Sequence, residues 1–398
     1  MRIIKTLLFL RCVIMTDYEK GLDEYKKKDY KASIDIFLPL ANQGHADSQN
    51  KLGEIYECIY YGFDVESFEN GEASESELCE NEFGNNELAF KWYQEAALHG
   101  HVEAQCNLSI FIYFMLGDSE SENEQSVKWC RKSANNGHAE AQARLARFYQ
   151  YGVPGLIKQN NFLAWGWYEK AAAHSKQSHE DRADYELESI HLAAEFLKSN
   201  DKAKIKLAIS CLVKYSDLGD TSAKIALANF YIEDENIENV NEALSLYNEV
   251  ITFSPFPTTI AVAQWNLCLA YMYGTKLIDV DKEMALDFAK AAANNNRSYY
   301  HEIANFYRGD TFETDWKKVE DLYIKSSGRV AESDYELAKI YRKKGIFGKP
   351  DYYVESFKHC KKAAESGGGY SEIGKKAQYL LAEMYLNGEG TKQNLEKA

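Results

Sequence analysis

Proline is scarce in this sequence, with five residues among 398, and no two of the eight cysteines form a C-x-x-C pair. So little proline, together with abundant Ala, Leu, Glu and Lys, favours helices over a β-rich architecture. Cysteines without a shared spacing do not predict a disulfide framework, and free cysteines are typical of a reducing compartment. We therefore expect an all-α protein of the cytoplasm.

Basic residues are also fewer than acidic ones: the sequence has 46 Lys and Arg and 61 Asp and Glu, which gives a net charge of −15. A chain of this charge has no general attraction for a phosphate backbone, so nucleic acid is not an expected partner. The length exceeds the size at which one compact core keeps growing. The sequence therefore predicts either several domains or an array of repeats.

Long apolar runs are missing as well, and this bears on export. Residues 1–15 resemble a signal peptide, but Lys5 and Arg11 interrupt the apolar stretch and no A-x-A-like cleavage site follows. The stretch is too short to span a bilayer. Met15 is an equally good start. We treat residues 1–15 as an upstream extension or weak signal, with a periplasmic location as the alternative to a cytoplasmic one, and place the structured region at 16–398.

A repeat with a period near 37 residues is the strongest feature of the chain. The first helix of each unit carries a leucine that is followed four residues later by an aromatic residue, as in Leu145 and Tyr149. This spacing places both side chains on one helical stripe that packs on neighbours. Comparable pairs are Leu52 and Tyr56, Leu108 and Ile112, Leu227 and Tyr231, Leu267 and Tyr271, Ile303 and Tyr307, Leu337 and Tyr341, and Leu381 and Tyr385.

The second helix of each unit has a large residue, then two small residues, then a glycine, as in Trp92, Ala96, Ala97 and Gly100. The small residues let two helices approach closely, and the glycine ends the helix in the left-handed conformation. We expect the large residue to lie in the core between helices. Trp129 and Trp167 take that position in other units, and Gly44, Gly137, Gly219, Gly367 and Asn296 take the position of the glycine.

Counting units gives about ten first helices and nine complete second helices, with the last unit cut at Ala398. The segments 44–49, 52–56 and 91–97 resemble the Sel-one-like repeat (SLR) family, a relative of the tetratricopeptide repeat, and the resemblance extends from Asp17 to the end. It implies a right-handed α-solenoid superhelix that serves as an adaptor or scaffold for partner proteins. Because the last unit lacks its second helix, we expect its Leu381 and Tyr385 face to be exposed and to invite self-association.

No catalytic, cofactor or metal motif is complete in the sequence. The segment 301–305 begins like a zinc-protease helix, but the second histidine is replaced by Asn305. His45, His101 and His138 recur at the turns between units, where whole repeats keep them roughly 10 Å apart, too far to share one ion. We therefore predict that these histidines pack at the turns, and that the protein is not an enzyme and needs no cofactor or metal.

Residues 63–86 contain eight acidic residues and no basic one. This composition predicts an acidic loop insertion between the helices of the second unit. Such runs are usually solvated and inert, although an insertion on one face of a solenoid is also a place where binding can diversify.

Partner-binding residues are predicted from the repeat geometry. First helices line the concave groove of a helix-pair solenoid, and the positions two and five after each conserved Leu point into it. A cluster of Arg, Lys and Asn can bind the backbone and carboxylates of a peptide, and the alternative is that these are ordinary solvated residues. The predicted partner-binding residues are Arg147, Gln150, Asn229, Asn305, Arg308, Lys339 and Arg342.

Two functions remain open from the sequence. The favoured one is a non-enzymatic scaffold or adaptor for protein–protein interaction that binds a protein segment in its concave groove. The alternative is a bacterial immunity or regulatory protein that neutralises a cognate toxin or enzyme by direct binding. Either function predicts a protein or peptide partner, without nucleic acid and without a membrane span.

Overall fold

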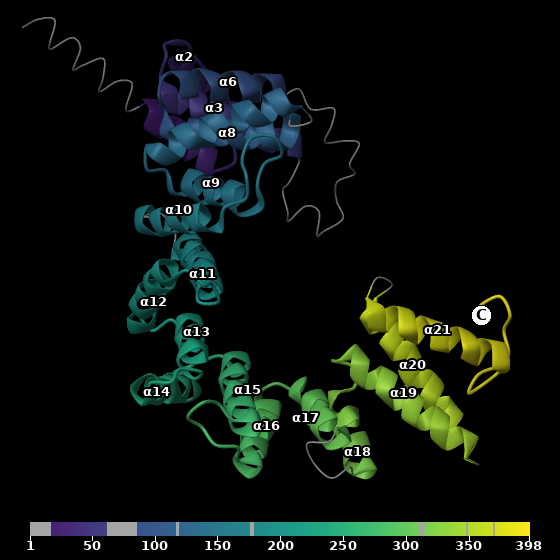
Figure 1. The fold of residues 1–398 in the computed structure, drawn as a ribbon. Coiled ribbons are helices and arrows are strands. Elements are labelled where there is room, and N and C mark those ends of the chain that lie inside the picture. Colours follow the sequence, from purple (N-terminus) through teal and green to yellow (C-terminus); the bar gives the residue numbers. More distant parts are fainter. Residues whose placement is uncertain are drawn as a thin grey trace, which may run out of the picture. The chain divides into compact units, whose positions relative to one another are not determined.

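The computed structural model describes residues 17–61, 86–116, 119–175, 179–309, 315–347, 349–368 and 371–398 (Figure 1). Residues 1–15 and nearly all of the acidic segment 63–86 lie outside the described residues. Within the described ranges every regular element is a helix, apart from one isolated β-bridge between Val153 and Ile157. The predicted all-α class is confirmed.

The chain divides into two compact units, residues 1–193 and 194–398. The first contains a helix at 17–26, α2 (Tyr30–Asn42), α3 (Ala46–Tyr61), α6 (Asn86–Leu98), α7 (Val102–Phe111), the π-helix η1 (Ile112–Leu116), α8 (Glu120–Asn135), α9 (Ala139–Tyr151), α10 (Asn161–His174) and most of α11 (His179–Phe196). The second contains α12 (Lys202–Asp217), α13 (Thr221–Tyr231), α14 (Ile237–Phe253), α15 (Pro257–Tyr273), α16 (Lys282–Asn295), α17 (Tyr299–Arg308), α18 (Trp316–Ser326), α19 (Ala331–Ile346), α20 (Tyr352–Gly367) and α21 (Glu372–Asn387). First and second helices alternate, and the described ranges hold the predicted ten and nine.

The predicted Leu stripe of the first helices forms the core. Leu52, Leu145 and Leu337 are all buried. In the last unit the expectation of an exposed face is wrong, because Leu381 and Tyr385 are half-buried. Phe357 of α20 packs edge-on against Tyr385, with ring centroids 5.3 Å apart, and covers part of this face. Self-association through the last unit stays a prediction.

The most deeply buried residue of the second helices lies one position later than predicted. Trp92 is buried, but Trp129 and Trp167 are only half-buried. Each of these two indoles carries a lysine over its face, with the Nζ of Lys170 4.0 Å from the ring centroid of Trp167. The fully buried residue is the next one along the chain, as with Tyr168. The face of the second helix that packs against neighbouring helices is therefore centred on this following residue.

The turns between units are built by glycine and histidine together. Gly100 and Gly137 have φ of 89° and 87°, in the left-handed region that favours glycine. The following His101 and His138 are N-caps, whose side chains accept hydrogen bonds from the backbone N–H groups of Ala104 and Ala141. These two turn histidines thus stabilise the N-termini of α7 and α9.

Two predicted helix ends are corrected by the structure. The left-handed residue after α20 is Gly368 rather than Gly367. Asn296, with a φ of −143°, has extended backbone and does not substitute for a left-handed glycine. Among the described helices, none has the length and apolar character that crossing a membrane requires.

Candidate binding groove

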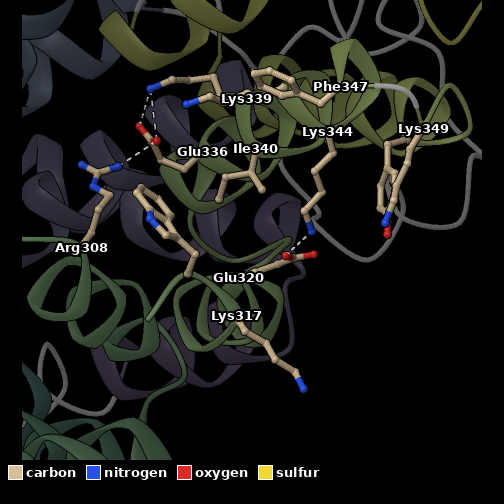
Figure 2. Close-up of a pocket in the computed structure, with 12 residues that line it drawn as sticks. Arg308, Lys317, Glu320, Glu336, Lys339, Ile340, Lys344, Phe347 and Lys349 are labelled. Carbon is tan, nitrogen blue, oxygen red and sulfur yellow. Dashed lines mark hydrogen bonds and ion pairs between the residues drawn. The ribbon is translucent and has the colours of Figure 1, made fainter. Parts of the chain in front are cut away.

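A groove of about 800 Å³ lies across α17, α18, α19 and the start of α20 in the second unit (Figure 2). We refer to it as the basic groove. It is lined by Arg308, Trp316, Lys317, Glu320, Glu336, Lys339, Ile340, Lys343, Lys344, Phe347, Lys349 and Tyr352. Six of these residues are basic and two are acidic. The basic groove therefore carries an excess of positive charge in a chain whose net charge is −15.

The local sequence explains how these side chains come together. Asp315 is the N-cap of α18 and accepts hydrogen bonds from the backbone of Lys317 and Lys318, which fixes Trp316 at the first helical position. On α19 the residues at 336, 340 and 344 are four apart and share one helical face, which contributes Glu336, Ile340 and Lys344 to the basic groove.

The two carboxylates of the basic groove neutralise only part of its charge. Glu336 lies between two cations, with one oxygen 2.8 Å from Nη1 of Arg308 and both oxygens 3.1 Å from Nζ of Lys339. Glu320 pairs with Lys344. Dashed lines in Figure 2 mark these contacts. Two carboxylates thus engage three cations.

The other three cations are Lys317, Lys343 and Lys349. All three are exposed, and none forms an ion pair with a residue in the described part of the chain. Exposed lysines of this kind are available to a negatively charged ligand, whose attraction is screened by salt.

Aromatic side chains are exposed beside this charge. Trp316 is 60% and Phe347 77% exposed, although aromatic residues of this size usually bury most of their surface. Tyr352 is held more firmly, because its ring stacks on Tyr341 with centroids 5.6 Å apart. The basic groove therefore offers exposed aromatic surface, which is typical of the anchors of protein interfaces, together with positive charge, which steers a negatively charged partner.

The seven predicted partner-binding residues separate into distinct groups. Arg308 and Lys339 line the basic groove. Arg342 takes the same position in its unit as Arg308 but does not line the basic groove. Its Nε lies 2.6 Å from Glu389 and its Nη1 lies 2.8 Å from Glu383. The hydrogen bond to Glu389, ahead of that to Glu383, raises the pKa of Arg342. This guanidinium is half-buried and holds two carboxylates, so it is not an ordinary solvated residue.

Three further predicted residues are bound within their own units. Each accepts a hydrogen bond from a tyrosine hydroxyl of the following second helix. The pairs are Gln150 with Tyr168, Asn229 with Tyr247, and Asn305 with Tyr323. Their amide oxygens thus already contribute to repeat packing.

Arg147 is exposed on α9 of the first unit and lies close to Tyr168, the tyrosine that contacts Gln150. Burial raises the pKa of Tyr168 to about 12, Glu188 acts in the same direction, and Arg147 opposes them. The partner-binding role of Arg147 stays a prediction.

Sequence reasoning missed Trp316, Lys317, Lys343, Phe347 and Lys349 as lining residues. One signal was present, because four lysines and an arginine lie between positions 339 and 349 of an otherwise acidic chain. Such a local reversal of charge indicates an interaction surface. The exposure of Trp316 had no comparable signal, since a tryptophan at the start of an amphipathic helix usually packs inward.

One cluster of possible metal ligands lies in the first unit, where ligand atoms of Cys106, His138 and Glu140 lie within 4.8 Å of one another. Nδ1 of His138 already accepts the backbone N–H of Ala141 at 3.3 Å, so Nε2 of the neutral ring carries the proton. Burial raises the pKa of the Cys106 thiol, which opposes formation of the thiolate that binds metals. These three residues therefore do not suit a metal ion.

Comparison with known families identifies the repeats. The family model described as Sel1 repeat matches residues 46–72, 82–101, 102–138, 139–175, 261–296, 331–368 and 375–398. Together these segments cover more than half of the chain. No curated protein matches the sequence.

Solved structures with the same fold are distant in sequence. The crystal structure of a protective antigen of uropathogenic Escherichia coli, described as displaying an SLR fold, has a TM-score of 0.50 at 20% identity and covers 96% of this chain and 74% of that chain. A Sel1 repeat protein from Oxalobacter formigenes has a TM-score of 0.42 at 19% identity, covering 77% and 83%. An immunity protein from Pseudomonas aeruginosa has a TM-score of 0.30 at 17% identity, covering 57% and 81%. At 20% identity the likeness to the antigen shows a shared fold alone. The TM-scores of the other two structures are below 0.5, so nothing is inferred from them.

Proposed function

Because the chain belongs to the Sel1 repeat family, we propose that it is a non-enzymatic scaffold that binds a segment of a partner protein in the basic groove. A helix-pair array gives a rigid surface on which side chains from successive helices are presented together. The basic groove takes its lining from four successive helices, α17 to α20, which is the kind of surface that an extended segment can follow.

One observation carries this proposal: exposed aromatic residues and lysines that form no ion pair with a described residue line the same groove. Lys343 and Phe347 lie one turn apart at the end of α19, and both are exposed. Aromatic anchors supply most of the affinity of protein interfaces, while charge steers the encounter and selects the partner. A volume of about 800 Å³ lies within the range of ligand-binding clefts.

Of the residues predicted from sequence, we assign Arg308 and Lys339 to contact with the partner. We assign Arg342 to the packing of α19 against the C-terminal segment through Glu383 and Glu389. Gln150, Asn229 and Asn305 serve chiefly to position second helices through their tyrosine partners.

The proposal is tested by photo-crosslinking in the native cell. A photoreactive amino acid at Phe347 should crosslink a partner protein, whereas the same group at Tyr379 of α21, which is 71% exposed, should not. The double variant K343E/K349E should lose that crosslink, since both lysines are exposed and neither forms an ion pair with a described residue. K206E/K375E changes the net charge equally at exposed positions outside the basic groove and serves as the control. An undiminished crosslink in K343E/K349E would exclude the basic groove as the binding surface.

A further inference from the structure

We propose that Glu336 is an internal substitute for a carboxylate of the partner, and that the basic groove takes an acidic segment with an apolar side chain close to its Asp or Glu. This inference rests on the proposed function and names the chemistry of the bound segment. It assigns Glu336 the role of a competitor, since its carboxylate occupies the site that the partner's carboxylate would take.

The first support is the geometry of Glu336. Its side chain, 20% exposed, is contacted by cations from two helices, Arg308 at the end of α17 and Lys339 one turn along α19. Both cations are more exposed than the carboxylate they share. A carboxylate arriving from solvent can therefore reach the outer side of Arg308 and Lys339 and compete for the same N–H groups.

The second support is charge. Six basic residues against two carboxylates leave the basic groove positive, although the chain as a whole carries −15. A local excess of this kind attracts an acidic segment over long range and repels a basic one. Lys317, Lys343 and Lys349 provide further contacts for carboxylates on either side of the central one.

The third support is the apolar surface next to Glu336. Ile340 follows Glu336 on the same face of α19, and Figure 2 shows its side chain between those of Glu336 and Lys344. Trp316 lines the same groove and is mostly exposed. A segment whose carboxylate replaces that of Glu336 would bring its neighbouring side chains against Ile340 and Trp316, where an apolar residue buries more surface than a polar one.

Single-stranded nucleic acid also binds surfaces that combine cations with aromatic rings. Here Glu320 and Glu336 lie among the cations, and a backbone with one negative charge per nucleotide cannot avoid both of them. A peptide can place its carboxylates only where the cations are free. The observations therefore favour an acidic peptide.

Neutralising Glu336 should strengthen the binding of an acidic segment by more than the loss of one repulsive charge. Glu336→Gln releases both Arg308 and Lys339, so an acidic segment no longer has to displace an internal carboxylate. We expect the Kd for such a segment to fall about fivefold, the effect of releasing two partly exposed ion pairs.

The experiment measures fluorescence anisotropy with the labelled peptide Gly-Glu-Glu-Leu-Phe-Glu-Gly. A second peptide has Ser in place of Leu and Phe, a third has Lys in place of Glu, and a short oligothymidine tests nucleic acid. The first peptide should bind best, and its affinity should fall as salt is added. E336Q should bind it about fivefold more tightly, whereas K339Q should bind it more weakly. E235Q, which breaks the exposed Lys276–Glu235 ion pair outside the basic groove, is the matched control and should leave the Kd unchanged.

The binding measurements test the role of Glu336 separately from the acidic character of the bound segment. If the wild type binds the first peptide but E336Q does not bind it more tightly, the role of Glu336 is wrong and the scaffold proposal stands. If no peptide binds while Phe347 still crosslinks a partner, the acidic occupant is wrong. Tighter binding of oligothymidine than of every peptide would overturn the peptide occupant. Helical circular dichroism and thermal melting of E336Q and K339Q verify folding, and the opposite directions expected for the two variants separate the inference from a general loss of structure.

Discussion

The hydroxyl of Tyr323 donates a hydrogen bond of 2.8 Å to Oδ1 of Asn305 and thereby ties a second helix to the first helix of its own unit. The same contact joins Tyr168 to Gln150 at 2.9 Å. Burial raises the pKa of Tyr323 to about 12, so the hydroxyl keeps its proton and remains a donor at neutral pH. A polar anchor within an otherwise apolar contact specifies the register in which the two helices pack.

Removing this anchor should be measurable without disturbing the apolar packing. Tyr323→Phe keeps the ring and leaves Asn305 without its donor, so we expect the free energy of unfolding to fall by about 1 kcal/mol. Urea denaturation followed by circular dichroism measures the change. Tyr379→Phe, at a largely exposed position, is the control. Equal stability of Tyr323→Phe and the wild type would mean that the hydroxyl contributes nothing to packing.

Acid should weaken the first unit through the N-cap residue His138. Burial lowers the pKa of His138, whose Nδ1 accepts the N–H of Ala141. The unfolded chain, in which the histidine pKa is about 6.5, therefore binds a proton more readily than the folded chain. The contribution of His138 to stability is complete above that unfolded value and is lost as the pH falls below it.

His138→Asn supplies an N-cap that does not titrate. We expect the difference in unfolding free energy between pH 7.5 and pH 5.5 to be smaller in His138→Asn than in the wild type, as measured by urea titration at both values. His191→Asn, on an exposed position of α11, should retain the pH dependence of the wild type. An unaltered pH dependence in His138→Asn would contradict the assignment.

Reversing the charge of Arg342 should destabilise the C-terminal helices. Arg342→Glu would place three carboxylates together, because Glu383 and Glu389 lose the guanidinium they share. Hydrogen bonds to charged groups contribute about 1.5–3 kcal/mol, so we expect a loss of that order and faster proteolysis after α20. Limited proteolysis and denaturation measure it. Arg329→Glu, at an exposed turn position, should be nearly neutral, and equal effects at both sites would show that the Arg342 pairs contribute little.

The fold could be predicted from the sequence because its signals are local and repeated. Leu145 and Tyr149 lie four residues apart whatever surrounds them, and the helical period alone places them on one stripe. The second helices were predicted less accurately. Trp129 and the buried Cys130 are neighbours, and the choice of which one faces the partner depends on the rotation of the packed helix.

The site could be predicted only in part because contacts distant in sequence decide it. Arg308 and Arg342 take the same position in their units, yet one lines the basic groove and the other is held by Glu389, 47 residues away. Nothing in the local spacing distinguishes them. The basic residues from Lys339 to Lys349 were visible as a run, but their grouping with Trp316 requires the packing of α18 against α19.

The tyrosine anchor also bears on how such arrays can change length during evolution. Tyr168 and Gln150 are 18 residues apart, as are Tyr323 and Asn305, whereas Tyr93 makes the equivalent contact to Glu57 across 36 residues. The anchor therefore joins the same two helix faces whatever length of chain connects them. New sequence can enter a unit at this connection, and whole units can be duplicated or lost, without leaving a buried tyrosine hydroxyl unsatisfied.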